Sequence, residues 1–361
     1  MRQPALIFFY LTRASMVVFW LLILAAFLYT PYLSYFFPNQ NSLNIYTWAD
    51  IFDIKQVREF EKQTGTKINL IYYDNGEELV SKLEITQGWG YDLMVLGDSY
   101  IPGLVQKNLL AKIDKNKLNF WVDLKPELLN QDYDLGNLYS LPYSWDIYGI
   151  GVDLDRFDHK LPISSWELVF NSKLSGKNIG MVEEGLRAFC IAMQYLYGNI
   201  ETVNLDQMQQ IKKLLINQKE IVEVYTELLG EYLLYSKSVP VVASQAAYIG
   251  RIMKNNPQIK FLVPQEGGFI STENFAILKS SNKNKLIYSF INFMYQKKVV
   301  DKFVKKTGFL PSRQDVLFEM DLSHLGGYET INANLFDRVG YFKYVAPREE
   351  VSRLWIEVKA S

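Results

Sequence analysis

Acidic and aromatic side chains follow the apolar strands that the sequence predicts, at the points where those strands end. These strand-end residues are Trp48, Asp50, Asp98, Tyr100, Glu183, Glu184, Ser244, Gln245 and Glu273. Ligands of open α/β sheets bind beyond the carboxyl ends of the strands, so we expect these side chains to line one site. Arg187, three residues after Glu184, is the single basic residue that joins this set, and carboxylates that face a cleft favour a cation. Desolvated aromatic rings would add about 0.5–2 kcal/mol each to that attraction.

The chain has few residues that could support metal binding, nucleotide binding or catalysis. Its two histidines, His159 and His324, lie in loop-like surroundings, which leaves almost nothing for a histidine metal site or a catalytic triad. The phosphate-binding lysine loop, the nucleophile elbow and the dinucleotide fingerprint are missing from the sequence. Glu184 and Glu273 could act as acid and base in an enzyme of the outer surface, but no nucleophile or metal set accompanies them. The sequence therefore predicts a binding protein without cofactor or metal, and not an enzyme.

The net charge of the chain and its N-terminal segment indicate where the protein acts. The net charge of −1 and the pI near 6.2 argue against nucleic acid, which requires a basic surface. Ala14 to Phe37 carries no charge, and as a helix it is long enough to cross a hydrocarbon core of about 30 Å. Arg2 and Arg13 precede it, so the positive-inside rule places the rest of the chain outside the cytoplasm. We predict an uncleaved transmembrane anchor; a cleaved signal peptide is the alternative, although "LAAFLY" is a poor cleavage site.

Strands alternate with helices along most of the chain, which indicates βαβ units and a mainly parallel sheet. The first half predicts strands at 42–48, 67–74 and 91–97 and helices at 53–65, 76–86 and 101–113. A second α/β series begins near residue 143 and includes 178–198, a helix at 205–220 and a strand leading into a helix at 239–254. Gly267-Gly268 predicts a tight turn before a strand at 272–278, with an ordinary hairpin turn as the alternative. No low-complexity linker separates the halves, so we expect two lobes joined by more than one crossing strand.

Seven segments, in order, resemble the periplasmic spermidine/putrescine-binding proteins of ABC importers, which are bacterial extracellular solute-binding proteins. They are "LNIYTWADIF", "KQTGTKI", "YDLMVLGDSYIPGLVQKNLLAKIDKNKL", "YSLPYSWDIYGIGVD", "SWELVF", "VPQEGGFISTENFAI" and "INFMYQKKVVDKFVKKTGFLPS". The resemblance covers Asn41 to Ser361 and implies an α/β, type II-like periplasmic-binding-protein fold with crossing hinge strands. We expect residues 1–38 to be the cytoplasmic head and anchor, 42–145 with 273–316 to form lobe 1, and 146–272 with 317–361 to form lobe 2.

The same resemblance implies a function. Members of that family close on a linear polyamine, such as putrescine or spermidine, and deliver it to an ABC permease in the membrane. We therefore expect a polyamine ligand, a permease partner, no nucleic acid, and a position on the periplasmic face of the cytoplasmic membrane, held there by the N-terminal helix.

The resemblance also implies which residues of this chain contact the ligand, by their position in the matching segments. Trp48 would stack on the methylenes of the ligand, and Asp50 would take one amine. In the family the glycine pair precedes a ligand-binding acid, which is Glu273 here; Glu273 and Glu184 would hold the other nitrogens. Phe309 would form a wall where the family usually has a tyrosine. Two aromatic residues near the first crossing, Tyr143 and Trp145, could also line the cleft.

Several positions depart from the family. Ala243 and Ser271 stand where the aromatic box of the family has tryptophans, and Gly97 and Ser99 replace a serine and a tyrosine. Losing two stacking rings would weaken a polyamine site by about 1–4 kcal/mol. Arg187 lies near the position of an expected acid, and a cation beside a diamine weakens binding further. One alternative is therefore the same fold binding an anionic or zwitterionic, thiamine-like ligand through Arg187; another is a sensor ectodomain that signals through a separate partner.

Overall fold

The computed structural model describes residue 13 and residues 15–25, 41–49, 51–158, 160, 162–176, 178–319 and 335–361. Its strands are β1 (Ser42–Thr47), β2 (Lys67–Tyr72), β3 (Leu93–Gly97), β4 (Ser140–Asp153), β5 (Ile179–Met181), β6 (Val222–Tyr225), β7 (Val241–Gln245), β8 (Ile259–Leu262), β9 (Gly268–Ile277), β10 (Leu310–Pro311) and β11 (Val339–Tyr341). Its α-helices are α2 (Ile54–Thr64), α3 (Gly76–Thr86), α4 (Ile101–Gln106), α5 (Ser172–Ser175), α6 (Gly185–Tyr197), α7 (Leu205–Gln218), α8 (Gly230–Tyr235), α9 (Ala246–Met253), α10 (Asn284–Met294), α11 (Lys297–Thr307), α12 (Gln314–Phe318) and α13 (Arg348–Ala360).

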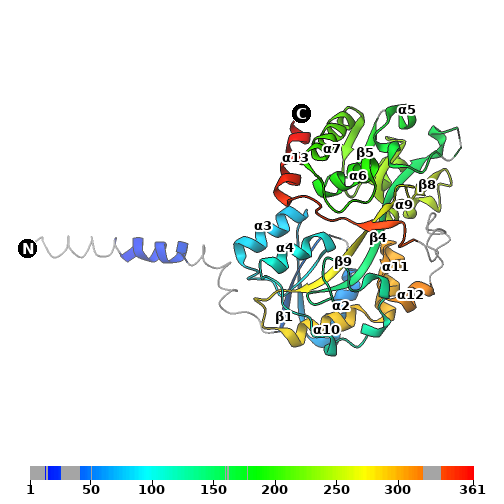
Figure 1. Ribbon diagram of the computed structural model, residues 1–361. Coiled ribbons are helices and arrows are strands. Elements are labelled where there is room, and N and C mark those ends of the chain that lie inside the picture. Colours follow the sequence, from blue (N-terminus) through cyan, green and yellow to red (C-terminus); the bar gives the residue numbers. More distant parts are fainter. Residues whose placement is uncertain are drawn as a thin grey trace, which may run out of the picture.

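The strands join two lobes through one continuous sheet in the order β2-β1-β3-β9-β4-β7-β5-β6. β1 pairs in parallel with β2 and β3 in the first lobe, and β5 pairs in parallel with β6 and β7 in the second. β4 and β9 are antiparallel to each other and run between the lobes, as Figure 1 shows for the yellow and green strands at the centre of the molecule. The sheet is therefore mixed rather than mainly parallel, because the long crossing strands pair with their neighbours in the antiparallel sense.

Local sequence signals explain where the helices of the first lobe begin and end. Asp53 caps α2 by accepting a hydrogen bond from the backbone of Lys55, and Gly65, with φ of 69°, ends it in the left-handed conformation. The helix predicted over 101–113 ends much earlier, at Gln106. Asn108 adopts a φ of 57°, which a continuing helix does not allow, and the chain then passes along the sheet.

The glycine pair forms a turn, but not a hairpin turn. Gly267 has a φ of 109°, where a side chain would be strained, and its N–H donates to the carbonyl of Pro264 at 3.0 Å. β8 pairs with β4 over Ile150–Asp153, and β9 pairs with the same edge of β4 from Tyr148 back to Ser140. The turn therefore connects two strands that follow one another along β4, and β9 continues into the first lobe.

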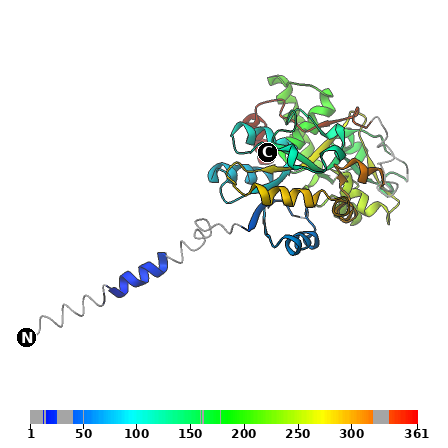
Figure 2. The same cartoon turned by 90° about the horizontal axis from the view of Figure 1, so that it is seen from below.

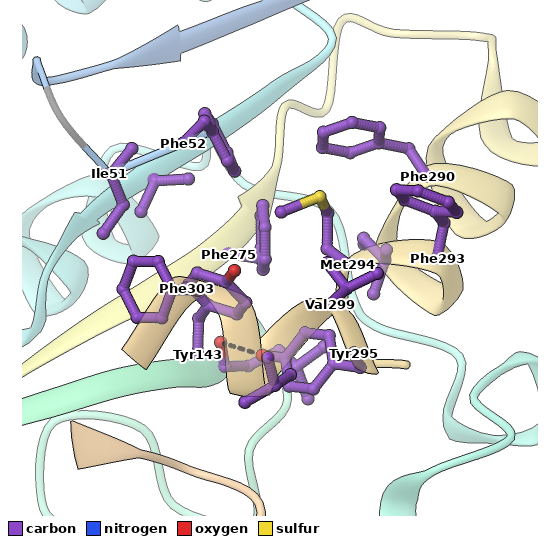
Figure 3. Packing of buried hydrophobic residues seen from close by; sticks show 14 of the residues in the cluster. Ile51, Phe52, Tyr143, Phe275, Phe290, Phe293, Met294, Tyr295, Val299 and Phe303 are labelled. Carbon is purple, nitrogen blue, oxygen red and sulfur yellow. Dashed lines mark hydrogen bonds between the residues drawn. The ribbon is translucent and has the colours of Figure 1, made fainter. Parts of the chain in front are cut away.

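Aromatic side chains fill the core of the first lobe, between the sheet and helices α10 and α11. Phe275 of β9 lies 5.1 Å from the ring of Tyr143, and Phe303 of α11 lies 5.0 Å from that ring (centroid distances; Figure 3). The hydroxyl of Tyr295 donates to the carbonyl of Pro142 at 2.7 Å, which holds α10 against the start of β4. Figure 2 shows these helices covering one side of the first lobe. A separate apolar cluster, built on α6, α7 and α13, supports the second lobe.

The N-terminal segment is described only in part. Residues 15–25 are helical, and their apolar side chains are mostly exposed. Much of the predicted span, Ala14 to Phe37, lies outside the described residues, as do His159 and His324. Among the helices that can be described, none combines the length and the apolar character that crossing a membrane requires.

Candidate ligand-binding cleft

A partly buried carboxylate of the first lobe lies against aromatic rings, to which the second lobe adds Tyr248. Trp48, which directly follows β1, donates its Nε1–H to Oε2 of Glu273 on β9 at 2.9 Å. The ring of Phe309 packs edge-on to Trp48 at 5.9 Å, and Tyr248 packs edge-on to Phe309 at 5.7 Å. Burial raises the pKa of Glu273, and the indole hydrogen bond and the charge of Arg187 oppose that rise. The carboxylate is thus held in place by a neutral donor in a desolvated setting.

Asp98 adds a second carboxylate beside the first. It follows β3, whose last residue, Gly97, pairs with Glu273, and it is only 2% exposed. Its carboxylate accepts hydrogen bonds from the backbone of Ser99 and Thr272, but its Oδ2 is buried and has no hydrogen-bond partner among the described residues. Burial, and then the nearby charge of Glu273, raise the pKa of Asp98 well above its ordinary value. A cation placed between Asp98 and Glu273 would relieve both costs.

The second lobe presents a carboxylate pair that already holds a cation. Nε of Arg187 lies 3.0 Å from Oε2 of Glu184, and its Nη1 lies 2.5 Å from Oε2 of Glu227. The hydroxyl of Tyr148 also donates to Glu227, at 3.1 Å. Burial alone would lower the pKa of Arg187, but Glu184 and Glu227 outweigh it and raise that pKa well above its ordinary value. Arg187 is therefore charged and largely compensated.

Besides the packing of Tyr248 on Phe309, a hydrogen bond joins the two lobes here. The hydroxyl of Tyr100, which follows β3, donates to Oε1 of Glu184 at 2.5 Å. Gly76 permits this approach, because a Cβ there would lie 1.8 Å from Tyr100 Cζ; Gly185, next to Glu184, allows Trp355 to pack closely, since a Cβ there would lie 2.6 Å from Trp355 Cγ. Burial and the charge of Glu184 raise the pKa of Tyr100 well above its ordinary value, so it stays a neutral donor.

A cavity of about 840 Å³ opens beside these residues, and both lobes line it. Tyr100 and Tyr133 contribute from the first lobe, Gln194 and Phe269 from the second lobe and the crossing strand, and Tyr344 from the segment before α13. Tyr100 belongs both to this cavity and to the carboxylate cluster, so the two regions are contiguous. The volume lies within the range of small-molecule sites, about 300–1,000 Å³.

The predicted site residues separate into three groups. The tertiary structure brings together Trp48, Asp98, Tyr100, Glu184, Arg187, Glu273 and Phe309, and of these Tyr100 lines the cavity of about 840 Å³. Two predicted residues lie in the core instead: Tyr143 is 1% exposed among aromatic rings, and Trp145 is fully buried with its Nε1–H donated to the carbonyl of Pro311 at 3.0 Å. They face inward because β4 is buried along its whole length in both lobes. Asp50 lies outside the described residues.

Three cleft residues were not predicted from the sequence: Tyr148, Glu227 and Tyr248. Glu227 comes soon after β6, so the strand-end rule would have found it had that short strand been recognised. Tyr148 lies within the crossing strand, and Tyr248 lies in the first turn of α9. For these two, no sequence signal separates a cleft aromatic residue from a core aromatic residue.

Comparison with known proteins relates this arrangement to a family. The profile of the bacterial extracellular solute-binding proteins matches residues 55–323. A putrescine/agmatine-binding protein of Pseudomonas aeruginosa is 27% identical over 294 residues, covering 77% of this chain and 80% of that protein. The spermidine/putrescine-binding periplasmic protein of Escherichia coli is 25% identical over 280 residues, covering 75% of this chain and 77% of that protein.

A solved structure supports the fold. The TpPotD lipoprotein of Treponema pallidum superimposes with a TM-score of 0.76 at 21% identity, covering 88% of this chain and 99% of that one. The expected two-domain periplasmic-binding-protein fold is thereby confirmed, with a mixed sheet. The expectation that the protein is not an enzyme is also confirmed, because the matched family binds solutes. Since the profile spans most of the sequence, the chain belongs to the bacterial extracellular solute-binding proteins.

Proposed function

We propose that this chain is the substrate-binding subunit of an ABC importer and that its ligand is a polyamine of the putrescine and spermidine type. One observation carries the choice of ligand. Asp98 is a buried carboxylate and Glu273 a partly buried one, and within the residues that the structure describes neither pairs with a lysine or arginine. Buried charges are costly unless they are paired, so this arrangement favours a ligand that brings a positive charge.

Aromatic faces support the same choice. Trp48, Phe309 and Tyr248 form a chain of edge-to-face rings next to Glu273. Such rings bury the methylene groups of an aliphatic amine and attract its ammonium group through cation–π interactions. The relatives named above are described as binding putrescine, agmatine or spermidine, which agrees with this chemistry.

An anionic ligand held by Arg187 receives less support. Its guanidinium group already contacts two carboxylates, Glu184 at 3.0 Å and Glu227 at 2.5 Å. The three side chains together carry a net negative charge, so an incoming carboxylate would be repelled.

The route to the membrane belongs to the same proposal. A partner permease would receive the ligand from the closed cleft, on the periplasmic side of the cytoplasmic membrane. We propose that the uncharged segment Ala14 to Phe37 anchors the chain there, on the strength of its apolar composition and the arginines before it. For the lobes we propose the boundaries 42–145 with 273–316 and 146–272 with 317–361. β9 pairs with β3 from Glu273 onward and β4 pairs with β7 from Tyr148 onward, which supports those boundaries.

Calorimetry on the purified full-length chain tests the ligand class. Titration with putrescine and with spermidine should give saturable binding heat, while sodium acetate at the same ionic strength should give none. Absence of heat with every diamine and polyamine up to millimolar concentration would reject the polyamine ligand and leave the family assignment intact.

A further inference from the structure

Arg187 occupies a setting that has the chemistry of an ammonium-binding subsite. Its Cζ lies 4.8 Å from the ring centroid of Tyr148 and 5.8 Å from that of Phe342, so the guanidinium group packs against two aromatic faces. Glu184 and Glu227 contact its nitrogens at 3.0 and 2.5 Å. Two carboxylates and two rings around a cation are what a cleft would offer to a protonated amine.

The two carboxylates that bind this guanidinium group are themselves held in place by other hydrogen bonds. Oε1 of Glu227 accepts the backbone N–H groups of Glu183 and Glu184, each at 3.0 Å. Oε2 of Glu227 accepts the hydroxyl of Tyr148 at 3.1 Å, and Oε1 of Glu184 accepts the hydroxyl of Tyr100 at 2.5 Å. Both acids are therefore fixed by groups other than Arg187, and the side chain fits into a prepared acceptor site.

The first-lobe end of the cleft is different. Glu273 accepts only a neutral indole N–H among the contacts given by the described residues, and Oδ2 of Asp98 is buried with no hydrogen-bond partner. The two ends of the cleft thus share carboxylates and aromatic rings. Among the described residues, the carboxylates of the second-lobe end contact a cation of the chain, Arg187, and Asp98 and Glu273 do not. Arg251 packs over the ring of Tyr248 at 4.9 Å, but its ion pair is with Glu231.

We propose that Arg187 is a built-in cation that fills one of two cation subsites, so that the cleft recognises a single ammonium group, at Asp98 and Glu273. This inference rests on the proposed function, and it narrows the ligand to an amine held strongly at one cationic end. A second ammonium group would add little binding free energy, because Arg187 already occupies the position beside Glu184 and Glu227. The chain then discriminates weakly between a monoamine and a diamine of equal length.

The test compares butylamine, putrescine and spermidine by calorimetry on the full-length chain and on three variants. The wild-type protein should bind putrescine no more than about threefold more tightly than butylamine, because the second ammonium group adds only a screened, exposed interaction. Arg187→Ala vacates the subsite, so putrescine should gain about tenfold or more over butylamine. Arg187→Lys keeps the cation and should keep the wild-type ratio. Lys212→Gln is the matched control: it removes one positive charge from an ion pair with Glu357 on the surface of the second lobe, and it should change nothing.

The outcomes separate this inference from the proposed function. A wild-type protein that prefers putrescine to butylamine by more than about tenfold would overturn the inference while leaving polyamine binding in place. A folded Arg187→Ala variant with the wild-type ratio of putrescine affinity to butylamine affinity would also overturn the inference. If that variant does not fold, as its melting curve would reveal, the wild-type and Arg187→Lys ratios still decide. No binding of any amine to the wild-type protein would overturn both.

Discussion

Replacing Glu273 with glutamine tests the centre of the proposed site. Glutamine has nearly the same shape and keeps an oxygen that can accept the Nε1–H of Trp48, now 2.9 Å away, but it removes the negative charge. Losing a charge-assisted hydrogen bond to an ammonium group costs about 1.5–3 kcal/mol. The dissociation constant for putrescine should therefore rise by about 10- to 150-fold.

The same substitution should not lower stability. Burial raises the pKa of Glu273, so the folded protein binds this proton more tightly than the unfolded chain does. Ionisation of Glu273 then costs stability, a cost that is absent below the ordinary pKa of the group and develops as the pH rises through the raised value. At neutral pH the ligand-free glutamine variant should unfold at the same urea concentration as the wild-type protein, or at a higher one.

Calorimetry with putrescine and urea unfolding of the ligand-free protein measure the two effects. Glu183→Gln is the matched control, because it makes the same chemical change at an exposed carboxylate close to the cleft and should leave both quantities near wild type. A Glu273→Gln variant that binds putrescine as tightly as wild type would refute the reasoning. A loss of binding that came with a clear loss of stability would show that Glu273 is a structural residue instead.

Three further results are expected. Gly76→Ala should displace Tyr100, since the new Cβ would lie 1.8 Å from Cζ of that ring; overpacking of about 1–3 kcal/mol should lower the melting temperature and weaken putrescine binding. Gly340→Ala, which has open space around it, serves as the control for the melting temperature, and equal melting temperatures of the two variants would count against the crowding argument. Arg313→Ala should lower the unfolding free energy by about 2 kcal/mol, because Arg313 binds two partly exposed aspartates and one buried carbonyl. The ratio of amine affinities should not change. Urea unfolding measures the loss of stability, and a loss under about 0.5 kcal/mol would contradict the prediction. Putrescine binding should release protons, because the ammonium group requires the ionised form of carboxylates such as Glu273, whose pKa is raised by burial. The affinity for putrescine should therefore increase as the pH rises through the raised pKa. Titrations in buffers of different ionisation enthalpy should give different apparent binding heats. Identical heats in all buffers would exclude coupled ionisation.

Local signals were enough for much of the fold and part of the cleft. The apolar run ending at Gly97 is a buried strand, and Asp98 and Tyr100 lie beyond it as the strand-end rule expects. The glycine pair marks a turn because Gly267 needs a positive φ. These features depend on residues close together in the chain, where side-chain type and backbone conformation are directly linked.

The helix predicted over 101–113 shows the limit of such signals. Its apolar spacing fits a helix, yet Leu110 forms a bridge with Leu278 of the sheet instead, after the positive φ of Asn108. Pairing with the sheet overrides the local helical preference here, since a marginal helix gains most of its stability from packing.

The sequence by itself determined many of the strands and helices and several of the acids at strand ends, because periodicity, caps and glycines act over a few residues. Only the tertiary structure decided which aromatic residues face the cleft and which charges are compensated. Tyr143 and Tyr148 lie on the same strand and both are buried, yet Tyr143 packs among the aromatic rings of the first lobe and Tyr148 donates its hydroxyl to Glu227. Arg187 meets Glu227 across 40 positions of sequence. Contacts over such separations depend on which strands pair, here β5 with β6 and, through β7, with β4, and composition and spacing along the chain do not contain that geometry.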